Sequence, residues 1–242
     1  MTLYTSISHD LETLIERCVD VLDTLCTQAL ARDGRFVVSL AGGNTPAGVY
    51  EVWARTSRLD WSKAVLIFGD ERCVPPEHAD SNYRMVKQSL LDHLPAKPLV
   101  LRMEGESETP TRAAVNYQRR IQAELAGPGN IHVAILGVGE DGHTASLFPG
   151  AEVLHATGTL CEDTWNADHT QQRLTLTVPA LRAARKRMFI VTGAGKARIL
   201  ASLLQGPLHP DGLPAQFFLR DEPLNTNLML DAAAAKFLQQ RD

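Results

Sequence analysis

The chain has 242 residues, of which 44% are hydrophobic and 21% are charged, and its formal net charge is −4. This composition is ordinary for a globular protein and argues against disorder and against general binding to nucleic acid or to a membrane surface. No apolar run approaches the roughly 20 residues of a membrane helix, and the amino-terminal residues do not resemble a signal peptide. We therefore expect a cytoplasmic protein. Because the sequence has no internal repeat and no linker, we also expect a single domain over residues 1–242.

The four cysteines are scattered, and they form neither a CxxC pair nor a zinc-type cluster with histidine. Cys18 and Cys26 fall on the apolar stripe of an expected helix, where a buried structural thiol is typical. Cys73 follows Arg72, whose charge favours a thiolate, but we identify no partner histidine and favour an inert thiol. The pattern predicts reduced thiols and no metal site.

Apolar residues recur every three or four positions from Leu11 to Leu30, which predicts a long amphipathic helix that ends before Gly34. The next apolar run is short and continuous, as in a strand that is covered on both faces. Thr45, Ser81 and Thr109 are expected to cap the three helices that follow. The expected elements are helix 11–30, strand 36–40, helix 46–53, strand 64–68, helix 82–91, a weak strand 99–101, and helix 110–125, ended by 127–129.

The second half repeats this alternation of strands and helices. An apolar run over 131–136 leads into a glycine-rich polar loop, and a run over 187–192 leads through residues 193–196 into another helix. Asp231 is expected to cap a last helix. The expected elements are strands 131–136, 158–161, 173–178 and 187–192, helix 196–203, strands 217–219 and 228–230, and helix 232–238.

This alternation predicts an α/β fold: a doubly wound, mostly parallel, Rossmann-like sheet flanked by helices, with a small additional strand region. In such sheets, ligands bind outside the carboxyl ends of the strands. Four polar loops, at 41–46, 69–72, 137–143 and 193–196, each follow an apolar strand. We therefore expect these loops to converge on one site.

Two of these loops have the composition of an anion site. Gly42, Gly43, Asn44 and Thr45 offer backbone N–H groups, an amide and a hydroxyl at the start of a helix, although a turn that merely needs glycine is the alternative. Lys196 places a point charge at the start of another helix, where a solvated lysine is the alternative. The GAGK string is not a P-loop, because a glycine and the final Ser or Thr are missing.

The loop at 69–72 places two carboxylates and an arginine at the end of a strand. Charges in such a position are commonly solvated, but at a shared edge Arg72 is suited to face an oxyanion. The roles of Asp70 and Glu71 stay open at this point. Asn82, at the start of the helix that follows, is expected to contribute an amide.

The loop at 137–142 matches the dinucleotide pattern GxGxxG, with Glu162 about twenty residues further on. A carboxylate at Asp141 and the stop at Pro149 and Gly150 disfavour that interpretation. His143 is the best catalytic candidate, because an imidazole accepts a proton at neutral pH when a neighbour fixes its tautomer. Asp141 is close enough in sequence to be that neighbour.

Taken together, these segments resemble the 6-phosphogluconolactonases, in the wider family that includes the glucosamine-6-phosphate deaminases. The most specific match is the string LGVGEDGHTASLFP. The matching segments are AGGNTP (41–46), FGDERCVP (68–75), SNYRM (81–85), LGVGEDGHTASLFP (136–149), RLTLT (173–177), FIVTGAGKA (189–197), LPA (213–215) and LDAAA (230–234).

The resemblance implies a carboxylic ester hydrolase that converts 6-phospho-D-glucono-1,5-lactone to 6-phosphogluconate in the oxidative pentose phosphate pathway. For this reaction, the residues suggest that His143 activates water, that Asp141 holds the imidazole, and that Arg72 or loop N–H groups stabilise the oxyanion. Binding of the 6-phosphate is then assigned to Gly43, Asn44, Thr45, Lys196 and Arg173. We expect no metal or organic cofactor, a monomer, and a phosphosugar lactone as the ligand.

Two other functions remain open. The deaminases carry a glutamate where this chain has Phe148 and a tyrosine where it has Arg72, and both differences favour the lactonase. Asp70 matches the proton-abstracting carboxylate of the deaminases and is here expected to bind either the substrate or the loop. A non-catalytic sugar-phosphate sensor is the third possibility, but no basic helix-turn-helix segment is present. Arg182 stands where the lactonase pattern has an asparagine.

Overall fold

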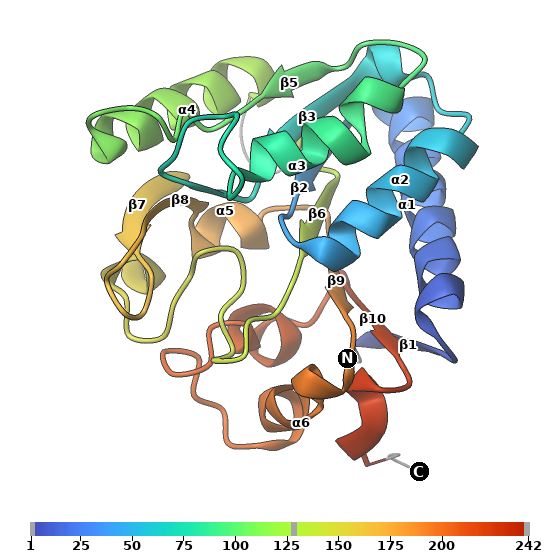
Figure 1. Ribbon diagram of the computed structural model, residues 1–242, viewed down its shortest axis with the longest axis vertical. Coiled ribbons are helices and arrows are strands. Elements are labelled where there is room, and N and C mark those ends of the chain that lie inside the picture. The colour runs from blue at the N-terminus through green and yellow to red at the C-terminus, as the bar shows by residue number, and fades with distance from the viewer. Residues whose placement is uncertain (1–2, 127–129, 240–242) are drawn as a thin grey trace.

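The computed structural model describes residues 3–126 and 130–239. Within these residues, seven strands form a parallel sheet in the order β1-β10-β9-β6-β2-β3-β5 (Figure 1). The predicted α/β fold with a mostly parallel sheet is confirmed. The strands are β1 (Tyr4–Ser8), β2 (Phe36–Leu40), β3 (Ala64–Phe68), β5 (Leu99–Leu101), β6 (Val133–Leu136), β9 (Lys186–Val191) and β10 (Thr226–Asp231).

The described residues also form a small antiparallel sheet in the order β4-β8-β7, which is the additional strand region expected from the sequence. Its strands are β4 (Asp70–Arg72), β7 (Cys161–Trp165) and β8 (Gln172–Leu176). Because β4 begins one residue after Gly69, which follows β3, the small sheet is attached directly to the carboxyl edge of the large one.

Helices cover both faces of the large sheet. In Figure 1, α1 and α2 lie to the right of the central strands, and α4 lies to the left with β7 and β8. The helices are α1 (Leu11–Asp33), α2 (Asn44–Thr56), α3 (Asn82–Ser89), α4 (Pro110–Leu125), α5 (Val178–Arg182) and α6 (Ala197–Gln205). Short 3-10 helices lie at Trp61–Lys63, Leu91–His93, Glu152–His155, Ala194–Lys196 and Ala234–Phe237.

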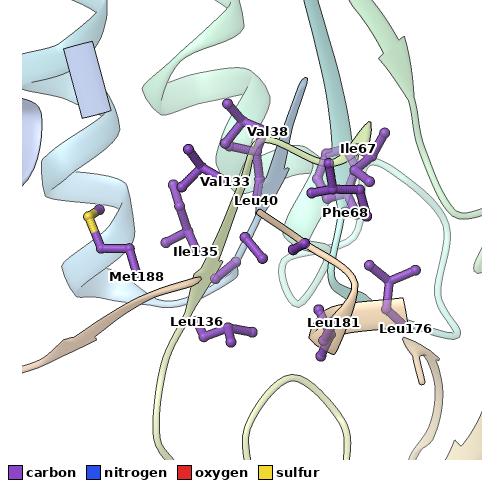
Figure 2. Packing of buried hydrophobic residues seen from close by; sticks show 14 of the residues in the cluster. Val38, Leu40, Ile67, Phe68, Val133, Ile135, Leu136, Leu176, Leu181 and Met188 are labelled. Carbon is purple, nitrogen blue, oxygen red and sulfur yellow. The ribbon is translucent and has the colours of Figure 1, made fainter. Parts of the chain in front are cut away.

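The core explains why the central strands read as continuous apolar runs. Every residue of β2, β3 and β6 is buried, because helices pack on both faces of these strands. Figure 2 shows Val38, Ile67 and Ile135 of this core. Leu176 of β8 and Leu181 of α5 belong to the same cluster, so the small sheet shares the core of the large one.

Helix boundaries agree with the expected signals at several ends. Gly34 ends α1 in the left-handed conformation, with φ 68°, and Ser81 caps α3 through its hydroxyl. The expected cap at Thr45 is wrong, because α2 begins at Asn44 and Thr45 Oγ1 lies 2.7 Å from Thr192 Oγ1 instead. Thr109 is the N-cap residue of α4 with Pro110 in the first turn, as expected, although its hydroxyl makes no capping hydrogen bond among the described residues.

Other expectations fail where local sequence is ambiguous. Residues 217–219, expected as a strand, belong to a π-helix (Phe217–Asp221), and the expected strand 158–161 overlaps β7 only at Cys161. Asp231 does accept from the N–H of Ala234 at 2.7 Å, but the helix there is a single 3-10 turn. The expected helix end at 127–129 lies outside the described residues. The edge strand β1 was not expected.

The described part of the chain holds neither a membrane-spanning helix nor a cluster of metal ligands. None of its helices combines the length and the apolar character needed to cross a membrane. No group of three or more His, Cys, Asp or Glu side chains in it is arranged to hold a metal ion.

Candidate active site

An open pocket of about 440 Å³ lies where the carboxyl ends of β2, β3, β6 and β9 meet. Each of the four polar loops contributes to its lining, so the predicted convergence is confirmed. The contributions are Gly42 and Gly43 after β2, Asp70 and Arg72 after β3, residues 137–140 and His143 after β6, and Lys196 after β9; Asn82 of α3 and Arg173 of β8 add further polar and charged groups.

His143 and Asp141 form a hydrogen-bonded pair beside this pocket. Nδ1 of His143 lies 2.5 Å from Oδ1 of Asp141, and the backbone N–H of His143 donates to the same oxygen at 3.1 Å. Burial alone would raise the pKa of Asp141, but the hydrogen bonds and charge of His143 hold it below its ordinary value. Asp141 is therefore ionised and accepts the Nδ1 hydrogen, and in the neutral form of the imidazole the lone pair then lies on Nε2.

The loop after β6 fits tightly around this pair. A Cβ atom at Gly139 would lie 2.1 Å from Nδ1 of His143 and 2.7 Å from Oδ1 of Asp141, so no side chain fits there. The N–H of Gly139 donates to the carbonyl of His143 at 2.8 Å and closes the turn. No helix follows this loop before the short 3-10 turn at Glu152–His155, which excludes the dinucleotide interpretation of GxGxxG.

Phe148 covers one side of the imidazole. Its ring centroid lies 4.7 Å from that of His143, with the two ring planes 52° apart, and Phe148 is 7% exposed. The position at which the deaminases carry a glutamate therefore holds an apolar ring in direct contact with His143. The carboxylate that is hydrogen-bonded to this imidazole belongs to Asp141.

Alternation along β4 separates the three charged residues that the sequence left unresolved. Asp70 and Arg72 line the pocket, whereas Glu71 points to the opposite side and binds the first turn of α3. The hydroxyl of Ser146 donates to Oδ2 of Asp70 at 2.6 Å. Ser146 also lines the pocket, and sequence reasoning missed it.

Two arginines stand side by side in this pocket without a carboxylate partner. Arg72 of β4 pairs in register with Arg173 of β8, and the Nε atom of each is buried without a hydrogen-bond partner. Burial lowers the pKa of Arg173, and the positive charge of Arg72 lowers it further. Apart from a hydrogen bond from Arg72 to the carbonyl of Asp80, neither guanidinium has a partner among the described residues.

The start of α2 borders the same pocket. Gly43 lies at φ 104°, a conformation that favours glycine, and a Cβ at Gly42 would lie 2.0 Å from Oδ1 of Asn82. Asn44 and Thr45 follow in the first turn of α2 but do not line the pocket. Their assignment to substrate binding stays a prediction, as do the roles of the residues that do line it.

Two side chains that the sequence singled out, those of Arg182 and Cys73, do not line the pocket. Arg182, the departure from the lactonase pattern, forms salt bridges with Asp221 and Glu222 and lies outside the pocket lining. Cys73 is half-buried, and burial raises the pKa of its thiol to about 11, so the nucleophilic interpretation is not supported.

The chain is similar to known proteins in sequence and in fold. The model of the family "Glucosamine-6-phosphate isomerases/6-phosphogluconolactonase" matches residues 9–227. The 6-phosphogluconolactonase of Synechocystis sp. is 36% identical over 209 residues, covering 84% of this chain and 86% of the relative. That of Nostoc sp. is 34% identical over 232 residues, covering 93% and 94%.

The fold has solved counterparts as well. A crystal structure of a 6-phosphogluconolactonase from Shewanella baltica superposes with a TM-score of 0.88 over 95% of this chain and 98% of that chain, at 21% identity. At this identity the likeness concerns the fold alone, whereas the match of the family model and the two relatives is one of sequence. The chain therefore belongs to the family of glucosamine-6-phosphate isomerases and 6-phosphogluconolactonases.

Proposed function

We propose that this chain is a 6-phosphogluconolactonase that hydrolyses 6-phospho-D-glucono-1,5-lactone to 6-phosphogluconate, a step of the oxidative pentose phosphate pathway. The observation that carries the proposal is the Asp141–His143 pair, which presents a basic Nε2 beside a pocket with three cationic side chains. The named activity of the relatives supports the choice of substrate.

In this proposal, Nε2 of His143 takes a proton from water while the water oxygen attacks C1 of the lactone. The carbonyl oxygen becomes an oxyanion, which the positive charge of the Arg72 guanidinium stabilises from the wall of the pocket. The bond between C1 and the ring oxygen then breaks, and the imidazolium returns its proton to that oxygen. The products are a carboxyl group, which ionises, and a hydroxyl group at C5.

Binding is assigned to the remaining cations and to the N–H groups at the start of α2. Lys196 and the N–H groups near Gly43 hold the 6-phosphate, because α2 has no side-chain cap on its first turn. Arg173 adds charge from the small sheet. Asp70 and Asn82 bind hydroxyl groups of the sugar. The two residues are linked, because the Asn82 amide donates to the backbone carbonyl of Asp70 at 2.9 Å.

Isomerisation with deamination of glucosamine 6-phosphate is the alternative, since the family contains that activity too. The contact of Phe148 with His143 disfavours it, because the glutamate that the deaminases carry at that position is absent. We further propose one domain, which acts as a monomer in the cytoplasm without nucleic acid as a partner. The single continuous core and the four free cysteines support this view.

The test is a coupled assay of 6-phosphogluconate formation from freshly generated lactone, with glucosamine 6-phosphate assayed in parallel. The lactone also opens without an enzyme, so the rate with heat-denatured protein is subtracted. Faster formation of 6-phosphogluconate than this background, without turnover of glucosamine 6-phosphate, is the expected result. Turnover of the amino sugar alone would favour the deaminase.

A further inference from the structure

Glu71 lies on β4 between two pocket residues, yet its side chain is directed away from the pocket. It is 2% exposed, and it forms no salt bridge with any described residue. A buried carboxylate without a cationic partner is costly unless hydrogen bonds compensate its charge. The contacts of Glu71 therefore indicate what it does for the pocket.

The carboxylate of Glu71 accepts four hydrogen bonds. Oε1 accepts from the N–H groups of Arg72 at 2.8 Å and Asn82 at 2.7 Å. Oε2 accepts from the N–H of Tyr83 at 2.8 Å and from the hydroxyl of Ser81 at 3.1 Å. Burial raises the pKa of Glu71, and the three N–H donors act against that rise because they favour the charged form.

These four donors join two segments that are otherwise separated by the loop 73–80. One donor belongs to β4, and the other three belong to the cap and first turn of α3. The first turn of a helix has N–H groups without intrahelical partners and a partial positive charge, and both favour a carboxylate. Glu71 thus fastens the start of α3 to the strand that carries Arg72.

This fastening determines where two pocket side chains lie. The Arg72 guanidinium donates to the carbonyl of Asp80, the residue directly before Ser81. The Asn82 amide donates to the carbonyl of Asp70 at 2.9 Å and contacts Gly42 so closely that a Cβ there would clash. A shift of the start of α3 would therefore move both the arginine and the amide.

We infer that Glu71 is a positioning residue: its buried carboxylate fixes the start of α3 against β4 and thereby holds Arg72 and Asn82 in place for the lactone. The inference rests on the proposed function. Glu71 contacts no substrate in this arrangement, and its effect on turnover passes through the two side chains that it places.

The test is Glu71→Gln, which keeps the shape of the side chain but directs an NH2 group at N–H donors. We expect kcat to fall by roughly 10- to 100-fold, because a displacement of about 1 Å at a catalytic group has effects of this size. The matched control is Glu77→Gln, which removes a charge from the exposed part of the same loop and should leave kcat and KM unchanged.

A double-mutant cycle separates positioning from general stabilisation. If Glu71 acts on kcat through Arg72, Glu71→Gln should lower kcat by less than about twofold in an Arg72→Ala background. Its effect on KM, which passes through Asn82, should remain. The inference is overturned if Glu71→Gln lowers kcat as much in the Arg72→Ala background as in the wild-type chain. It is also overturned if a folded Glu71→Gln protein has the wild-type kcat.

If Glu71→Gln does not fold, Glu71→Asp replaces it, because aspartate keeps the charge but has a shorter side chain. The same loss of kcat is expected for Glu71→Asp, and the same two outcomes would overturn the inference. Binding of 6-phosphogluconate is measured by calorimetry for every variant. Should the wild-type chain not hydrolyse the lactone, the proposed function fails. The inference is then decided by whether Glu71→Gln, unlike Glu77→Gln, weakens that binding.

Discussion

Two pockets of similar size lie at opposite ends of the large sheet. The candidate active site, of about 440 Å³, lies at the carboxyl ends of the strands, and a second pocket of about 430 Å³ lies at the amino ends of β6, β9 and β10. Each contains cationic side chains and a histidine bound to an aspartate. In the second pocket Nε2 of His132 lies 2.8 Å from Oδ2 of Asp33.

What differs is how completely the polar atoms are satisfied. Nδ1 of His132 accepts from the N–H of Val37 at 2.8 Å, so both of its nitrogens are occupied. Arg185 of the second pocket donates to Asp33 and Asn130, and Lys186 donates to Asn225. In the carboxyl-end pocket, by contrast, buried Nε atoms lack partners. Unsatisfied donors, and not the number of charges, distinguish the candidate active site.

The largest expected effect is that of His143→Ala, which removes the proposed base. Loss of a general base costs roughly 10²- to 10⁴-fold in rate, so kcat should fall within this range while the unfolding midpoint changes little. The measurement is the coupled lactone assay together with thermal unfolding. If His143→Ala has the wild-type kcat, the imidazole takes no part in the mechanism. The two histidines would then not differ in their effect on turnover.

The second largest effect is expected for Gly139→Ala, which should reduce kcat by roughly 10- to 100-fold. The added methyl group would meet Nδ1 of His143 at 2.1 Å, so the imidazole must move or lose Asp141. Gly195→Ala is the matched control, because a Cβ at that position meets nothing within 4 Å. Equal rates in the two variants would mean that the loop after β6 is looser than the contacts indicate.

Lys196→Ala compares the two ends of β9. Lys196 follows this strand into the candidate active site, and Lys186 begins it in the second pocket. Removal of the proposed phosphate anchor should raise KM roughly tenfold with little change in kcat, as expected for binding that substrate and transition state share. Lys186→Ala should change neither constant. A fall in kcat alone after Lys196→Ala would contradict a phosphate-anchor role.

His132→Ala should leave turnover unchanged and act on stability instead. It leaves the buried N–H of Val37 without its acceptor, which costs about 1–3 kcal/mol, measurable by urea unfolding. Burial lowers the pKa of His132 below its ordinary value of 6.5, despite the opposing effect of Asp33. The unfolded chain therefore binds a proton first, and the free energy of unfolding falls as the pH drops below about 6.5. In His132→Ala this contribution should vanish; if it persists, another group causes it.

Much of this architecture was predictable because it is encoded locally. The central strands β2, β3, β6 and β9 contain the apolar runs, and the polar loop after each must emerge at the carboxyl edge of a parallel sheet. His143 was predictable because its loop follows such a run and contains a carboxylate two residues away. The family resemblance then supplied Arg173, which lies on another sheet.

The remaining features depend on contacts between distant residues. Ser146 meets Asp70 across 76 positions, and no local pattern marks a serine for that contact. The edge strand β1 is exposed or partly exposed at every residue except Ser8, and among the described strands it pairs with β10. Phe217 and Phe218 suit a strand by propensity, but tertiary packing places them in a π-helix. The side to which Glu71 points depends on the register of β4, which sequence alone left open.

The pairing of β1 with β10 also affects the order in which the molecule can assemble during synthesis. Residues 4–8 leave the ribosome long before residues 226–231, and β10 is the single neighbour of β1 among the described strands. Contacts so distant along the chain form slowly, because closing a long loop costs entropy before the contact is gained. One edge of the sheet therefore stays incomplete until translation of β10 ends, and an arrested nascent chain would expose the outer edge of β9.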